Sequence, residues 1–185
     1  WHSGIFQRRA TALSVGGRNY NVNDVEYYFR SALAEEYYMG YYTGGATFDP
    51  SADLHTQYVD EGQTQSYYDY FMEQAISQLT EAAALENAAA EEGFTLSEED
   101  KAAVEESINS TKTSAEENGY PNLESYLRAN YSRYMTVSDY RTCVERDTLV
   151  NNYKTAYSDK QEVTEEDLET YYQENAASLD SYDYR

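Results

Sequence analysis

The feature that most constrains the fold of this chain is an apolar stripe with helical spacing that is built partly from tyrosine. In residues 23–42, "NDVEYYFRSALAEEYYMGYY", apolar side chains recur at i, i+3, i+4, i+7 and i+8. This spacing predicts an amphipathic helix with one core-facing stripe. The stripe consists of Val25, Tyr28, Phe29, Ala32 and Leu33. Asn23 is the expected N-cap, with Glu26 in a capping box, and Gly44 with Gly45 is the expected stop.

Tyrosine supplies much of the aromatic surface of this chain. Leu, Ile, Val and Phe total 28 of 185 residues, whereas Tyr alone contributes 22. A chain so poor in those four residue types, with a net charge of -21, has the composition of a disordered segment. Tyrosine rings nevertheless bury nearly as much area as phenylalanine rings, and helical periodicity and capping signals recur along the chain. We therefore expect a folded, mainly helical domain with its own core.

The charge balance excludes one class of partner. Acidic residues outnumber basic ones by 34 to 13, and the imbalance is steepest in residues 61–120. A surface of this kind repels phosphate backbones, so we expect no nucleic-acid binding. It favours solubility and cationic or neutral partners. No apolar run approaches the length of about 18 residues that a membrane span needs, so any membrane association would depend on an anchor outside this chain.

Few residues are available for catalysis or metal binding. Cys143 is the single cysteine, which excludes an internal disulfide and a thiolate zinc site, and its helical context predicts a small core residue. With only His2 and His55, the chain has too few histidine side chains for nucleophilic catalysis or for a histidine-rich metal centre. The acidic triplet 98–100 lacks the spacing of a calcium loop and predicts a helix start instead. We expect no catalytic residue, metal or cofactor in this chain.

The rest of the chain divides into a hairpin, a loop and further helices. Residues 12–22 predict two short strands around Gly16 and Gly17, and residues 43–65 predict a polar loop outside regular structure. Ser97 is an expected N-cap, and Thr164 with Asp167 is an expected capping box. The further helices are expected over 66–92, 97–117, about 123–131, 138–157 and from 164 onward, which gives six helical segments in all. The last ten residues, with Tyr182 and Tyr184 in alternation, predict an incoming strand.

These segments carry a resemblance to a known family. "ALSVGGRNYNVNDVEYYF" is similar to the opening of SurA/PrsA-type foldases, where a short hairpin leads into the first helix. "GFTLSEEDKAAVEESI" and "YPNLESYLRANY" resemble the middle helices of the same family in Gram-positive gut bacteria. "VTEEDLETYYQENAASLDSYDYR" resembles its exit helix and the first strand of a parvulin-type peptidylprolyl isomerase domain. The resemblance covers nearly the whole chain, although the isomerase domain itself is missing beyond Arg185.

The resemblance implies a fold and a domain organisation. The fold would be a multi-helix peptide-binding domain like those of SurA and trigger factor, with a short N-terminal hairpin. Residues 1–11 would form a juxtamembrane or linker segment, 12–178 the helical chaperone domain, and 179–185 the start of a truncated parvulin-type domain. In the family such chains are associated with the outer side of the cell membrane and assist the folding of exported proteins. The basic pair Arg8 and Arg9 instead favours the cytoplasmic side.

A chaperone function offers a reason for the tyrosines. A tyrosine ring is rigid, has a wettable edge and accepts varied apolar partners. We expect Tyr28, Tyr68 and Tyr171 to lie in the core, because they fall on the helical stripes. Rings off the stripes or beside the long loop are the candidate contacts for unfolded or exported polypeptides. These candidates are Tyr27, Tyr38, Tyr41, Tyr42 and Tyr67.

The sequence leaves three readings open. In the first, the chain is a non-catalytic chaperone domain that binds peptides. In the second, its longer parent is also an enzyme that isomerises X-Pro bonds through a domain outside this chain. The alternative is a tyrosine-rich acidic cell-surface or wall-binding structural domain, which accounts for acidity and aromatics but not for the strand-like C-terminus. A homodimer formed by helix swapping is also left open.

Overall fold

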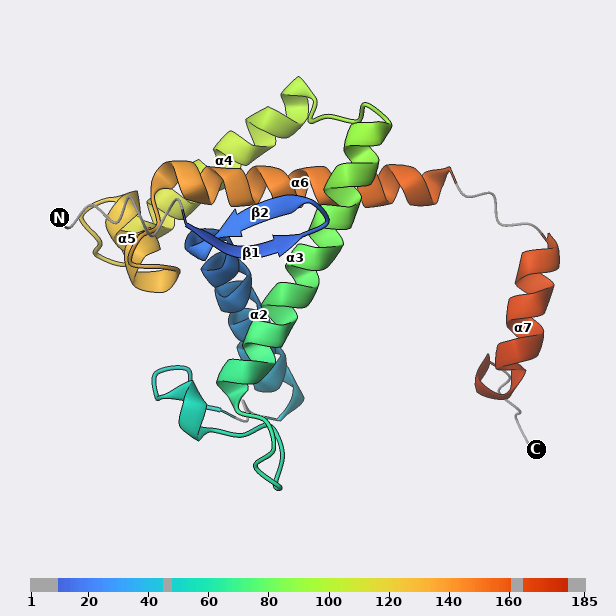
Figure 1. Ribbon diagram of the computed structural model, residues 1–185, viewed down its shortest axis with the longest axis horizontal. Helices are drawn as coiled ribbons and strands as arrows, with labels where there is room; N and C mark the ends of the chain where they lie inside the picture. The colour runs from blue at the N-terminus through green and yellow to red at the C-terminus, as the bar shows by residue number, and fades with distance from the viewer. Residues whose placement is uncertain (1–9, 45–47, 161–164, 180–185) are drawn as a thin grey trace.

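The computed structural model describes residues 10–44, 48–160 and 165–179, and in these ranges the chain is mainly helical. This part of the chain contains six α-helices and one antiparallel hairpin, as the sequence predicts, and a short 3-10 helix, η1. The elements, labelled as in Figure 1, are β1 (Thr11–Val15), β2 (Arg18–Asn21), α2 (Val22–Thr43), η1 (Leu54–Thr56), α3 (Tyr67–Glu91), α4 (Glu98–Glu117), α5 (Leu123–Asn130), α6 (Val137–Asp159) and α7 (Glu165–Leu179).

Three long helices form the frame of the molecule. α2 packs along α3, and both contact α6, which crosses them at one end (Figure 1). α4 and α5 pack on α6 and on each other. The loop of residues 48–66 lies at the end of α2 and α3 that is far from α6 (Figure 1). The C-terminal turns of α2 therefore reach away from the α6 end of the molecule, toward this loop.

The hairpin is held against α3 by its turn. Gly16 and Gly17 have φ of +59° and +76°, a left-handed backbone that glycine adopts without strain. The Asn87 side chain of α3 donates to the carbonyl of Gly16 at 2.8 Å. Because a lone hairpin is unstable in water, this docking is what allows two strands to persist.

α2 begins two residues earlier than its expected cap. Its N-cap is Asn21, whose side chain accepts from the backbone N–H groups of Asn23 and Asp24, while Asp24 accepts from the N–H of Asn21. The prediction of Asn23 and Glu26 as the capping pair is therefore wrong. β2 leads directly into the helix, and Asn23 is buried instead, where it donates to Asp139 of α6 at 2.9 Å.

The other helix ends follow the sequence signals more closely. Ser97 caps α4 as predicted, in a capping box with Asp100, and Gly44 is the C-cap of α2. Thr164 lies outside the described residues. The N-caps of α3, α5 and α6 are Ser66, Asn122 and Thr136. Each of these side chains accepts a backbone N–H that the first turn of the helix leaves unpaired.

The core is divided into two clusters. The first lies among the hairpin, α2, α3 and the loop, and the second among α4, α5 and α6. Tyr28 is buried in the first cluster and Tyr68 is packed partly against it, as predicted. Tyr27 touches both clusters and so bridges them. The largest fully buried side chains in the described part of the chain are Phe71, Leu79, Leu127, Met135, Asn23 and Cys143.

The loop of residues 48–66 is attached to the core at two points. Phe48 and Leu54 are buried in the first cluster, although the sequence predicts only a polar loop here. The side chain of Asp53 caps η1, and Tyr58 pairs with Ser66 in an isolated β-bridge. The expectation of irregular structure holds for most of the loop, but the loop folds back on α3 because two apolar residues anchor it.

α7 lies apart from the other helices (Figure 1). Its residues Leu168, Tyr171 and Tyr172 are exposed, and the prediction that Tyr171 belongs to the core is wrong, since the ring is 60% exposed. Tyr171 does lie in a helix, α7, but no other helix lies along α7 in Figure 1. The helix runs to Leu179, so residues 176–179 are helical rather than extended. The strand expected around Tyr182 and Tyr184 lies outside the described residues.

Candidate functional site

The last two turns of α2 carry a group of exposed tyrosine rings. Tyr38, Tyr41 and Tyr42 are 64%, 75% and 82% exposed, as the sequence predicts for rings off the apolar stripe. The centroids of the Tyr41 and Tyr42 rings lie 5.8 Å apart. The helix continues just past them and ends at Gly44, whose φ of +134° suits glycine. We call Tyr38, Tyr41 and Tyr42 the α2 tyrosine surface.

A hollow of about 430 Å³ begins at Tyr38 and extends toward α5. Burial is the main cause that raises the pKa of Tyr126 in its wall, and the nearby Tyr140, Tyr120 and Tyr38 hydroxyls add to it. The hollow, which we call the α2–α5 hollow, is lined by Arg30, Ser31, Leu33, Ala34, Tyr38, Pro50, Tyr126, Ala129, Asn130 and Tyr131. Its walls combine apolar and aromatic side chains with the polar Arg30, Ser31 and Asn130, so the hollow offers both apolar contact and hydrogen-bonding groups.

Arg30 gives the α2–α5 hollow a polar group. Its Nε atom is buried and has no hydrogen-bond partner among the residues that the structure describes. The guanidinium lies 5.8 Å from the centroid of the Phe29 ring. A buried N–H without a partner is costly, and this one is closed off from solvent, so it is a local energetic cost and not a donor on the surface of the hollow.

Tyr27 does not present a free ring, which corrects the expectation drawn from its place off the stripe. Its hydroxyl donates to Asp147 of α6 at 2.8 Å, and its ring stacks on Tyr131 with centroids 5.5 Å apart. Burial, followed by the charge of Asp147, raises the pKa of Tyr27 well above its usual range. The flank of α2 that carries Tyr27 faces α6, so this tyrosine is a packing residue between the two core clusters.

Tyr67 is a core residue, which corrects the expectation of an accessible ring beside the loop. It is 5% exposed, and its ring lies 4.7 Å from Phe48 and 5.7 Å from Phe71, measured between centroids. The reason is the return of Phe48 from the loop, which covers Tyr67. Of the five candidate rings, the structure therefore brings together only Tyr38, Tyr41 and Tyr42.

Sequence reasoning missed several residues of this surface. Tyr37 and Met39 are 38% and 56% exposed on the same two turns of α2, and Tyr37 also reaches Phe48 with centroids 6.2 Å apart. The spacing of Arg30, Ala34 and Tyr38 at i, i+4 and i+8 was a signal for one wall of the hollow. Nothing in the sequence indicated that Pro50 and α5 would supply the other wall, because that depends on how the loop folds after α2 and on the arrival of α5, which is distant along the chain.

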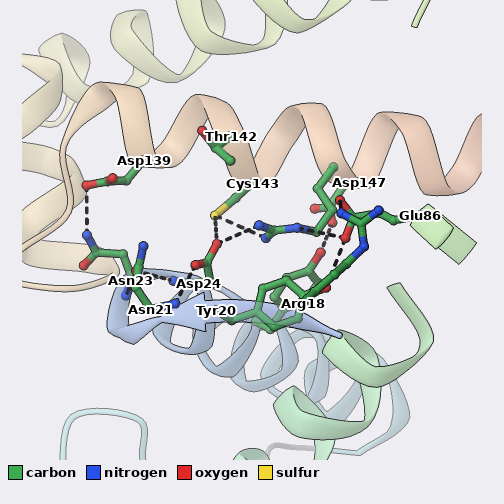
Figure 2. Close-up of polar contacts among 12 residues, drawn as sticks. Arg18, Tyr20, Asn21, Asn23, Asp24, Glu86, Asp139, Thr142, Cys143 and Asp147 are labelled. Carbon is green, nitrogen blue, oxygen red and sulfur yellow. Dashed lines mark hydrogen bonds and ion pairs between the residues drawn. The ribbon is translucent and has the colours of Figure 1, made fainter. Parts of the chain in front are cut away.

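A buried polar network joins the hairpin, α2, α3 and α6 (Figure 2). Arg146 donates to Asp24 at 2.8 Å, and both side chains are about nine-tenths buried. The Nε atom of Arg146 lies 3.7 Å from Glu86, which also accepts from the Tyr20 hydroxyl at 3.0 Å and from Arg18 at 3.3 Å. Each charge faces an opposite charge, so the network holds four elements together and has no feature of a reactive site.

Cys143 lies within the same network but is not a reactive thiol. Its sulfur is 3.8 Å from Asp24 (Figure 2) and 4.0 Å from Arg146. Burial raises the pKa of this thiol well above its ordinary value and outweighs the lowering effect of Arg146. A thiol in this state is not nucleophilic, and Cys143 is the small buried residue that the sequence predicts.

Two kinds of site are not found in the described part of the chain. No three His, Cys, Asp or Glu side chains gather there in a way that could hold a metal ion. Of the helices in the same part, none has the length and apolar character of a membrane span. The described residues thus define a mainly helical protein with an exposed aromatic surface. Comparisons with protein-family models, curated proteins and solved structures find no match for this chain.

Proposed function

We propose that this chain is a peptide-binding chaperone module that holds unfolded polypeptides on the α2 tyrosine surface and in the adjoining α2–α5 hollow. The observation that carries the proposal is the exposure of Tyr38, Tyr41 and Tyr42 on two consecutive turns of one helix. A group of exposed rings beside a hollow with partly apolar walls is a feature of interaction surfaces.

Tyrosine suits this task better than leucine for a physical reason. A chaperone surface must stay open in water and still accept apolar segments of different shape. The tyrosine ring offers a large apolar face, a polar edge and only two torsions to order, so it binds varied partners at a low entropic cost. The same residues as leucine would favour self-association of the free protein.

The proposal extends to the family of the protein and to its location in the cell. The resemblance of residues 12–29 and 163–185 to SurA/PrsA-type foldases supports an extracytoplasmic chaperone domain at the outer side of the cell membrane. It also supports a parent protein that isomerises X-Pro bonds through a parvulin-type domain. A prolyl isomerase assay on the full-length gene product tests this part of the proposal. Activity is expected for that product and none for residues 1–185 alone.

The chaperone proposal is tested by removing the exposed rings. A variant with Tyr38→Ser, Tyr41→Ser and Tyr42→Ser should lose most of its suppression of aggregation of an unfolded client, and most of its binding of an apolar peptide. Its melting temperature should stay within a few degrees of the parent, because exposed side chains contribute little to stability. A control with Tyr157→Ser and Tyr171→Ser, which are 51% and 60% exposed elsewhere, should keep both activities.

Two results would overturn the chaperone proposal. One is a folded triple variant that protects the client as well as the parent does. The other is a triple variant that melts far below the parent, which would make the three rings part of the core. Binding of the parent to cell-wall polymer, without protection of any client, would instead support the alternative of a tyrosine-rich wall-binding domain.

A further inference from the structure

The α2–α5 hollow contains an arginine that no carboxylate neutralises. Most basic side chains in the described part of the chain form ion pairs with acidic ones, as Arg18, Arg141 and Lys154 do. Arg30, which lines the hollow, forms no ion pair with any residue that the structure describes. Carboxylates are abundant in a chain with 34 acidic and 13 basic residues, so an arginine without one is a distinctive feature of this hollow.

The guanidinium of Arg30 is closed on one edge and open on the other. Its Nε atom is buried, and the group lies 5.8 Å from the centroid of the Phe29 ring. Nη1 and Nη2 also have no hydrogen-bond partner among the described residues, but they are not buried atoms, so this edge of the group is accessible. The two terminal nitrogens of a planar guanidinium present parallel donors, which match the two oxygens of a carboxylate.

No acidic side chain of the hollow competes for this edge. The residues that line the hollow include no Asp or Glu. Glu26 lies one turn before Arg30 on α2, and the two form no ion pair. Burial is the main cause that raises the pKa of Glu26, and the charge of Arg30 opposes it. The hollow is therefore a local positive site on an acidic protein.

The hollow is closed toward α6 and continues along α2 in the other direction. Tyr131 in its wall stacks on Tyr27, whose hydroxyl is bonded to α6. Arg30 and Tyr38 line the hollow together from one side of α2, and Tyr41 follows on that side three residues later. The helix rises about 12 Å from Arg30 to Tyr38, a length that about three or four extended residues span. A polypeptide that enters from the tyrosine surface would thus end near Arg30.

We propose that the α2–α5 hollow binds the carboxyl terminus of an apolar polypeptide, with the terminal carboxylate on Arg30 and the last side chains beside Tyr38. An Asp or Glu side chain within a polypeptide fits less well, because its chain would have to continue past the closed end of the hollow. The net charge of -21 disfavours anionic partners in general, so a carboxylate is favoured only where an unpaired cation faces it. The inference rests on the proposed chaperone function and names the part of a client that its site would prefer.

The test uses three short peptides that share one apolar sequence. The first ends in a free carboxylate and the second in a carboxamide. The third also ends in a carboxamide but has a glutamate in place of its central residue. The parent should bind the first peptide roughly 10-fold more tightly than the second, because a hydrogen bond between two charged groups is much stronger than a neutral one. The third peptide should bind no more tightly than the second, since its carboxylate does not reach Arg30.

Variants assign the preference to Arg30. Arg30→Met keeps an apolar stem beside Phe29 and removes the charge, so it should weaken the carboxylate peptide far more than the carboxamide peptide and bring their ratio near unity. Its melting temperature should stay within a few degrees of the parent, because no ion pair is lost. Arg30→Lys retains the charge and should keep a smaller preference. The matched control is Lys112→Met on α4, which removes an exposed charge that has no ion pair among the described residues and should keep the full preference.

The failures of the two proposals are distinguishable. Equal binding of the carboxylate and carboxamide peptides to the parent would overturn the carboxylate site and leave the chaperone proposal standing. A preference that survives in Arg30→Met, or that falls equally in Lys112→Met, would also overturn it, since the charge would act from elsewhere. Tighter binding of the glutamate peptide than of the plain carboxamide peptide would overturn the choice of a chain terminus. If none of the peptides binds, both proposals fail.

Discussion

Tyr28 of α2 donates its hydroxyl to Asp147 of α6 at 2.5 Å, within the buried boundary between the two helices. The preceding residue, Tyr27, donates to the other oxygen of the same carboxylate at 2.8 Å. Two consecutive tyrosines therefore hold one carboxylate of the facing helix, which leucine could not do. Tyrosine in this helix has two separate uses: hydrogen bonding at its N-terminal half and exposed rings at its C-terminal half.

The first prediction concerns this pair of hydrogen bonds. Tyr28→Phe should lower the free energy of unfolding by about 1.5 to 3 kcal/mol, the range for a hydrogen bond to a charged group. The double change with Tyr27→Phe should cost more than the sum of the single changes, because Asp147 then loses both donors. Urea unfolding measures both values. Tyr157→Phe on the exposed end of α6 is the control and should be neutral; an equal loss there would refute the argument.

The second prediction concerns the buried ion pair of Arg146 and Asp24. Arg146→Met should destabilise the fold by about 3 to 5 kcal/mol, since it leaves a buried carboxylate without its cation. The control is Arg141→Met on the same helix, whose partner Glu105 is half-exposed. That change should cost no more than about 1 kcal/mol. Similar losses in the two variants, measured by urea unfolding, would show that Arg146 contributes packing alone.

The helices could be predicted from the sequence because their signals are local. Spacing, caps such as Ser97 and turn glycines such as Gly16 act within a few residues, and the observed bounds agree with them to within a few residues, the exception in detail being the cap of α2, which is Asn21 and not Asn23. The environment of a ring off the stripe depends instead on which distant element arrives beside it. Tyr27 is covered by α6, and Tyr67 is covered by Phe48 of the loop.

A helical pattern can also predict a buried side chain where the structure shows an exposed one. Tyr171 has the spacing of a core residue, yet it is exposed because no other helix lies along α7 in Figure 1. A periodic pattern predicts that a face is apolar, but it does not predict that a partner covers it. The exposure of Tyr38, Tyr41 and Tyr42 was predictable because the apolar stripe ends at Leu33, before these rings begin.

The third prediction concerns alkaline pH. Burial, then the charge of Glu86 and the hydrogen bond it accepts, raise the pKa of Tyr20 to about 12. Burial likewise raises the pKa values of Tyr27 and Tyr28. The folded chain thus holds these protons more tightly than the unfolded chain. Their stabilising contribution is complete below a pH of about 10, the ordinary tyrosine pKa, and is lost as the pH rises beyond it.

Urea unfolding at a series of alkaline pH values, together with the absorbance of tyrosinate, checks this prediction. The free energy of unfolding should fall from about pH 10 upward, and the buried rings should ionise together with the loss of helix. Tyr20→Phe should reduce the slope, because it removes one of the groups with a raised pKa. A free energy that stays constant across this range would contradict the assignment.

The last prediction concerns the anchor between the loop and the candidate surface. Phe48 is 7% exposed and packs on Phe71 with ring centroids 5.2 Å apart, and it also touches Tyr37 of α2. Phe48→Ala should cost about 3 to 5 kcal/mol, as expected for a buried phenylalanine. The contacts that are lost are those that attach the loop to α2 and α3. Residues 49–65 should therefore become sensitive to limited proteolysis before the helices do. Ile108→Ala on α4, in the second cluster, is the matched control: it should lower stability without exposing the loop. Equal protease resistance of the loop in both variants would mean that Phe48 does not anchor it.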